Sequence, residues 1–134
     1  MKPTYYLALA AFSLATGCVS RYRFETEPPN YAGIAEMKVR VNKTELRELS
    51  LHVDHLAPPR NIDPNMREYV AWIAVPGHGT TKLGKLDYDE DDREADLLAT
   101  SAFDKFEVII TLESDTSSTA PSDRVVLRQI VGKG

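Results

Sequence analysis

Apolar and polar residues alternate along most of the chain, and this period of two is typical of β-strands that bury one face. In residues 37–41, Met37, Val39 and Val41 alternate with Lys38 and Arg40. The same pattern predicts strands at residues 49–53, 106–112 and 125–130, and a less regular strand at 83–88. Residues 69–75 are apolar on both faces and stop at Pro76-Gly77, which predicts a central strand.

Two segments fit a helix as well as a strand. Leu46, Leu49 and Val53 have helical spacing, but the strict alternation over 49–53 favours a strand there. Residues 92–103 also place apolar residues at helical spacing, after an acidic start that suits a helix N-terminus. For this second segment we predict a strand over 94–99, followed by a helical turn before Phe103.

Six or seven short strands separated by turn-forming residues predict an all-β fold. We expect one antiparallel β-sandwich, immunoglobulin-like, with about seven strands. Trp72 lies between Ala71 and Ile73 in the apolar segment 69–75, so we expect it to pack in the core. The predicted organisation is a signal peptide over 1–17, a tether over 18–35 and the sandwich domain over 36–134.

The N-terminus has the organisation of a bacterial signal peptide. Lys2 is followed by the apolar stretch 5–14, which is too short for the roughly 20 residues that span a bilayer. Residues 14–18, Leu-Ala-Thr-Gly-Cys, resemble the bacterial lipobox, although Ala15 stands where the pattern favours a larger aliphatic residue. The resemblance implies cleavage after Gly17 and lipidation of Cys18, which attaches the protein to a membrane.

Cysteine usage agrees with this interpretation. Cys18 is the single cysteine of the sequence, so it has no disulfide partner in an oxidising exported compartment. Lipidation gives this thiol a role. The residue after it is Val19 rather than Asp, which by resemblance to sorted lipoproteins implies the outer membrane, periplasmic side, where the host is Gram-negative.

The segment after Cys18 lacks an apolar period and contains Pro28-Pro29, which favours an extended tether. Its aromatic residues, Tyr22, Phe24 and Tyr31, could contact a partner or the membrane interface. The alternative, a solvated linker that contains aromatic residues, is the simpler interpretation.

Charge excludes one class of partner. The chain has 16 Lys and Arg against 20 Asp and Glu, a formal net charge of −4. Nucleic-acid binding requires clustered basic residues, so we expect no nucleic-acid partner. The negative net charge gives no general attraction to anionic lipid either. We therefore expect the protein to attach to the membrane through the lipid on Cys18.

A series of short motifs follows in order along residues 37–130: Leu56-Ala57-Pro58-Pro59, Tyr69-Val70-Ala71-Trp72, Leu83-Gly84-Lys85-Leu86, the acidic turn 89–92, Ala102-Phe103-Asp104, Ile110-Thr111-Leu112-Glu113 and residues 121–127. Together they resemble the extracytoplasmic domain of RskA-type anti-sigma factors. The resemblance implies a β-rich fold and an envelope location. An anti-sigma factor also needs a cytoplasmic sigma-binding part and a spanning helix, and the chain shows neither. Control of a sigma factor is therefore not implied.

Three acidic residues have the spacing of a calcium loop. Asp87, Asp89 and Asp91 match its first ligand positions, and carboxylate oxygens suit Ca²⁺. Asp92 and Leu98 stand where an EF-hand requires Gly and Glu, so that loop is excluded. A looser calcium site remains an alternative to a solvated acidic turn.

No catalytic set emerges from the remaining polar residues. His52 and His55 are three apart, so on a strand they point to opposite faces and cannot share a zinc ion. His78 lies between Gly77 and Gly79, where a mobile loop is the simpler interpretation, and no nucleophile pattern surrounds the serines of 116–122. We predict no enzyme and no cofactor. We expect a lipid-anchored interaction or sensing module with an envelope protein partner, or alternatively a small-ligand or calcium-binding lipoprotein.

Overall fold

The computed structural model describes residues 19–26 and 33–132. The signal segment, Cys18 and Tyr31 lie outside these residues. The described chain consists mainly of strands, together with the short helix α1 (Pro59–Ile62). The strands are β1 (Val19–Glu25), β2 (Ile34–Val41), β3 (Arg47–Asp54), β4 (Glu68–Val75), β5 (Gly79–Lys85), β6 (Asp87–Asp89), β7 (Glu94–Ser101), β8 (Phe106–Glu113) and β9 (Val125–Val131).

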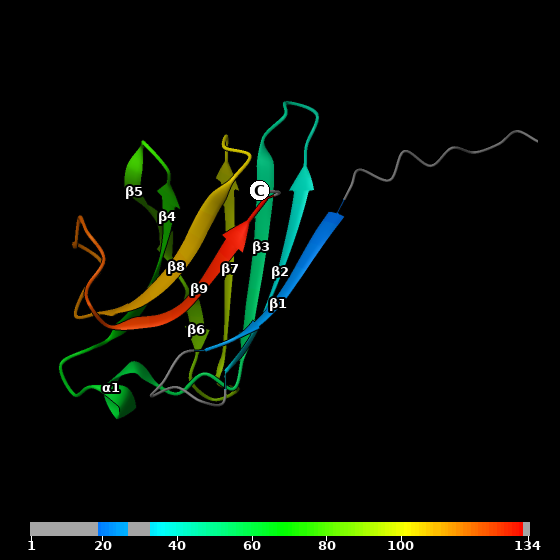
Figure 1. Ribbon diagram of the computed structural model, residues 1–134. Helices are drawn as coiled ribbons and strands as arrows, with labels where there is room; N and C mark the ends of the chain where they lie inside the picture. Colours follow the sequence, from blue (N-terminus) through cyan, green and yellow to red (C-terminus); the bar gives the residue numbers. More distant parts are fainter. Residues whose placement is uncertain (1–18, 27–32, 133–134) are drawn as a thin grey trace, which may run out of the picture.

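The strands form two antiparallel sheets that pack face to face (Figure 1). Sheet A has the order β1-β2-β3-β7-β6, and sheet B has the order β5-β4-β8-β9. Setting β1 aside, these orders correspond to strands A-B-E-D and C′-C-F-G of an immunoglobulin-like sandwich. The predicted all-β sandwich is confirmed. The described residues contain nine strands rather than about seven.

The core lies between the two sheets and follows the alternation seen in the sequence. In β2, Ala35, Met37 and Val39 are buried while Glu36 and Lys38 between them are exposed. Every strand of the sandwich except the edge strands β1, β5 and β6 contributes fully buried apolar side chains in this way. The largest that these strands contribute to the core are Tyr69, Phe106, Met37, Ile110, Leu112 and Leu127.

The predicted tether contains a strand, which corrects the expected domain boundary. β1 pairs with β2 along its whole length, from Val19 opposite Arg40 to Glu25 opposite Ile34. Tyr22 and Phe24 pack against the core, and the Tyr22 hydroxyl accepts a hydrogen bond from the Gly132 backbone N–H at 3.1 Å. The sandwich therefore begins at Val19 rather than near Glu36. The sequence pattern missed β1 because an edge strand buries few residues.

Two local predictions also differ from the structure. The segment 83–88 is divided between β5 and β6, because the chain passes from sheet B to sheet A at the buried Leu86, whose N–H donates to the Tyr69 carbonyl. The helical turn expected before Phe103 is wrong. The chain there forms bends, and the Phe103 N–H donates to Ser101 Oγ at 3.1 Å. The strands expected around 49–53 and 94–99 are confirmed as β3 and β7.

Candidate functional site

Around Trp72, the outer face of sheet B is covered. Trp72 is fully buried on this face, in a second apolar cluster with Val70 and Ile109. Lys82 lies 5.3 Å from the centre of the indole ring and donates to the Thr116 carbonyl in the loop after β8. Trp72 is thus buried as expected, but outside the core that lies between the sheets.

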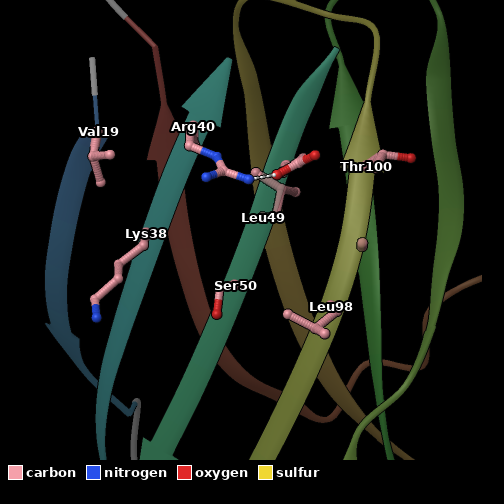
Figure 2. Close-up of a pocket in the computed structure, with 9 residues that line it drawn as sticks. Val19, Lys38, Arg40, Leu49, Ser50, Leu98 and Thr100 are labelled. Carbon is pink, nitrogen blue, oxygen red and sulfur yellow. Dashed lines mark hydrogen bonds and ion pairs between the residues drawn. The ribbon is translucent and has the colours of Figure 1, made fainter. Parts of the chain in front are cut away.

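The outer face of sheet A is open to solvent and forms the candidate site. Figure 2 shows a hollow on this face, with Val19 of β1 and Lys38 of β2 on one side and Leu98 of β7 on the other. Its volume is about 670 Å³. Leu98 is 82% exposed and Val19 is 47% exposed, so two apolar side chains face water at the same site.

One ion pair crosses the upper part of the hollow. The Arg40 guanidinium donates to the Glu48 carboxylate at 2.6 Å, between neighbouring strands (Figure 2). This hydrogen bond, and a weaker one from the Asn42 side chain, lower the pKa of Glu48 below its ordinary value. Both charged groups are exposed, so the pair contributes little to stability and mainly sets the polarity of the rim.

Charge is distributed unevenly across this face. Strands β1 and β2 present four basic side chains, Arg21, Arg23, Lys38 and Arg40, together with the acidic Glu25 and Glu36. The opposite side of the sheet presents acidic ones, namely Asp54, Asp87, Asp89, Glu94 and Asp96. A face divided in this way favours a partner with complementary charges in the reverse order.

His52 lies at the boundary of the acidic half and contacts two carboxylates. Its Nδ1 lies 2.7 Å from Asp96 Oδ1, and its Nε2 lies 2.8 Å from Asp54 Oδ1. The hydrogen bond with Asp96 and then that with Asp54 raise the pKa of His52, and partial burial opposes them. Glu94 brings a further carboxylate close, so that one ligand atom from each of His52, Asp54 and Glu94 lies within 4.8 Å of the others.

The structure places the predicted calcium residues differently. Asp87 and Asp89 lie on β6, and Asp89 Oδ1 accepts hydrogen bonds from the backbone N–H groups of Asp91 and Asp92. Among the described residues, the set that could hold a metal ion is His52, Asp54 and Glu94, and it includes none of the three predicted aspartates. The carboxylate of Asp89 instead caps the β6–β7 turn.

The other two histidines are separate from this cluster. His55 follows β3 in a left-handed conformation, with φ of 57°. His78 lies in the β4–β5 turn, where its ring centre is 5.1 Å from that of Phe103. The serines of the β8–β9 loop have structural contacts: Ser118 Oγ donates to Glu113, and Ser122 Oγ donates to the Leu112 carbonyl.

Sequence reasoning missed the cluster around His52 because its members are distant in the chain. His52 and Asp96 are 44 residues apart and become neighbours through the pairing of β3 with β7. The alternation that predicted both strands places both residues on the solvent face, which was a usable indication. The register that sets them opposite each other could not be found without the fold.

No family model, no curated protein and no solved structure matches the chain. Within the part of the chain that the structure describes, no helix is both long and apolar enough to cross a membrane.

Proposed function

We propose that the protein is a lipid-anchored, non-enzymatic module of the bacterial cell envelope, which binds a protein partner through the outer face of sheet A. The supporting observation is the hollow around Leu98, an apolar side chain that is 82% exposed on an open sheet face. Exposed apolar groups with a charged rim are typical of protein interaction sites. The resemblance to RskA-type anti-sigma factors stays a prediction.

The position of β1 supports an orientation of this site toward the membrane. Cys18 is bonded directly to Val19, the first residue of β1 and part of the lining of the hollow. A lipid on Cys18 would therefore hold the hollow within one residue of the bilayer surface. The partner that fits this geometry is an envelope protein that lies in or against the same membrane.

Site-specific cross-linking in cells tests the partner. A photo-reactive amino acid at position 98 is expected to capture one dominant envelope protein, and Lys38→Glu combined with Arg40→Glu is expected to abolish this capture. The matched control carries the same group at Ile130, which is 56% exposed on β9 of sheet B. Equal capture from positions 98 and 130, or capture from neither, would refute the proposed surface.

Membrane fractionation tests the anchor separately. Cys18→Ser removes the thiol that accepts the lipid, so the variant is expected to remain uncleaved or to become soluble. Globomycin-type inhibition of the lipoprotein peptidase is expected to leave the unaltered chain with its signal segment attached. A Cys18→Ser variant that is processed and stays on the membrane like the parent would refute lipid anchoring.

A further inference from the structure

We propose that His52, Asp54 and Glu94 bind one divalent transition-metal ion, of the Zn²⁺ class, on the outer face of sheet A, and that Asp96 is the positioning residue that orients His52. This site differs from the predicted calcium turn in position and in chemistry. It lies on the same face as the hollow around Leu98, but it shares no residue with the lining of that hollow.

The donor set selects the class of ion. One imidazole nitrogen and two carboxylate oxygens lie within 4.8 Å of one another, so small side-chain movements would bring all three to a single cation. Zn²⁺ binds imidazole nitrogen and carboxylate oxygen at about 2.0–2.2 Å. Ca²⁺ and Mg²⁺ prefer sets made entirely of oxygen, so the imidazole favours a transition metal. With three protein ligands, the fourth position of a tetrahedral ion would be open to water or to a partner's side chain.

Asp96 gives His52 the orientation that a metal ligand needs. Nδ1 lies 2.7 Å from Asp96 Oδ1, so an N–H at this position donates to the carboxylate and leaves the lone pair on Nε2. Nε2 points toward Asp54, whose Oδ1 lies 2.8 Å away. A carboxylate that holds the far nitrogen of a ligating histidine is the usual second partner in zinc sites.

The backbone holds the ligands in place before any ion binds. His52 is directly opposite Asp96 in the β3–β7 pair, and Asp54 is two residues further along the same face of β3. Glu94 begins β7 just after Arg93, whose carbonyl accepts a hydrogen bond from the Leu56 N–H at 2.9 Å. This bond joins the ends of β3 and β7, so both strands that carry ligands are fixed relative to each other.

The surrounding charges favour a dication. Glu36 of β2 is directly opposite His52, and Asp87 of β6 is directly opposite Asp96. Two basic residues lie near on the same face: Lys38 of β2, two residues from Glu36, and Arg23 of β1, on the far side of Glu36. Carboxylates therefore outnumber cations around His52 on β2, β3, β6 and β7, which lowers the electrostatic cost of bringing a divalent ion to the site.

Calorimetric titration of the full chain, purified in detergent and stripped with EDTA, tests the proposal with Zn²⁺ as the probe. We expect one equivalent to bind. His52→Gln is expected to abolish binding, and Asp96→Asn to weaken it 10- to 100-fold. The matched controls are His55→Gln and His78→Gln, which alter the other two histidines of the chain and are expected to bind zinc like the parent.

Nitrogen NMR of the imidazole rings separates metal binding from a simple ion pair. With Zn²⁺ bound, His52 is expected to keep one proton, on Nδ1, and to show the shift of a metal-bound Nε2. The proposal is overturned if zinc leaves the His52 nitrogens unchanged, if no equivalent binds, or if His52→Gln, shown by circular dichroism to be folded, binds as the parent does. Loss of cross-linking from position 98 would not bear on these measurements, so the two proposals fail independently.

Discussion

Trp72 Nε1 donates a hydrogen bond to Thr111 Oγ1 at 2.9 Å, which joins β4 to β8 on the outer face of sheet B. Both residues are fully buried although they point away from the core between the sheets. The Thr111 hydroxyl in turn donates to the Glu113 carboxylate. A buried polar chain of this kind covers the part of the outer face of sheet B around Trp72.

Thr111→Val removes the acceptor of the indole N–H while preserving the shape of the side chain. The N–H then stays buried without a partner, so the free energy of unfolding is expected to fall by about 1–3 kcal/mol. Urea denaturation followed by tryptophan fluorescence measures this loss. Thr80→Val on β5 makes the same change at an exposed site and is expected to stay within about 0.5 kcal/mol of the parent. Equal stability of the two variants would contradict the role of Thr111.

Glu113→Gln is expected to open the loop between β8 and β9. The Glu113 carboxylate accepts hydrogen bonds from the Ser122 N–H at 2.9 Å and from Ser118 Oγ at 3.1 Å, as well as from Thr111. An amide has one acceptor oxygen in place of two, so at least one of these bonds is lost. Trypsin is expected to cleave the variant after Arg124 faster than the parent.

The control for this experiment is Glu107→Gln, which changes the same residue type on the same strand. Glu107 forms a surface ion pair with Arg128 at 3.0 Å, a type of contact that adds little to stability. Its trypsin cleavage is expected to match that of the parent. Cleavage after Arg124 at the same rate in all three proteins would show that Glu113 does not hold the loop.

The alternation of residues predicted the sandwich because both sheets bury only one face of most strands. Residues 37–41 and 49–53 show this directly, since their apolar members are all buried except Val41 at the end of β2. The alternation predicted the fold least well for strands that bury few residues and for strands that are buried on both faces. β1 buries few side chains, so its segment lacks a clear period. The apolar run 69–75 indicates burial on both faces, but it does not show that Trp72 lies on the outer face with Val70 and Ile109.

The candidate site could be predicted far less well than the fold. Leu98 lies in the segment 92–103, where apolar residues have helical spacing, yet it is the most exposed of the large apolar residues in the described chain. Its exposure depends on β7 lying in sheet A, with Leu98 on the outer face. His52 and its carboxylates depend on the register of β3 with β7. Both features arise from strand pairing between distant segments, which local patterns do not encode.

Leu51→Ala and Leu98→Ala form a matched pair that tests which leucine belongs to the core. Leu51 is 3% exposed, whereas Leu98 is 82% exposed on the neighbouring strand β7. Leu51→Ala leaves a cavity and is expected to lower the free energy of unfolding by about 2–5 kcal/mol. Leu98→Ala is expected to change it by less than about 0.5 kcal/mol. Comparable losses in urea denaturation would mean that Leu98 is covered, and the proposed binding face would then be wrong.

Tyr69 makes the stability of the fold sensitive to alkaline pH. Its side chain is 1% exposed, its hydroxyl donates to the Ala57 carbonyl, and burial raises its pKa above the ordinary value of a tyrosine. Burial also raises the pKa of Tyr88, whose hydroxyl donates to the Leu56 carbonyl and whose ring packs edge-on against that of Tyr69. Both hydroxyls therefore stay protonated in the folded protein after their unfolded counterparts ionise.

The sign of the effect follows from this proton balance. Above pH about 10 the unfolded chain loses the Tyr69 proton while the folded chain keeps it, so the free energy of unfolding falls as the pH rises. Below that pH the contribution of Tyr69 to the free energy of unfolding is fully present.

Tyr69→Phe is expected to lower the free energy of unfolding by about 1 kcal/mol at pH 7 through the lost hydrogen bond, and to flatten its decline between pH 9.5 and 11. Tyr88→Phe, at a less buried ring, is expected to flatten it less. Urea denaturation across this range measures both slopes, and a decline in Tyr69→Phe as steep as in the parent would assign the alkaline sensitivity to other groups.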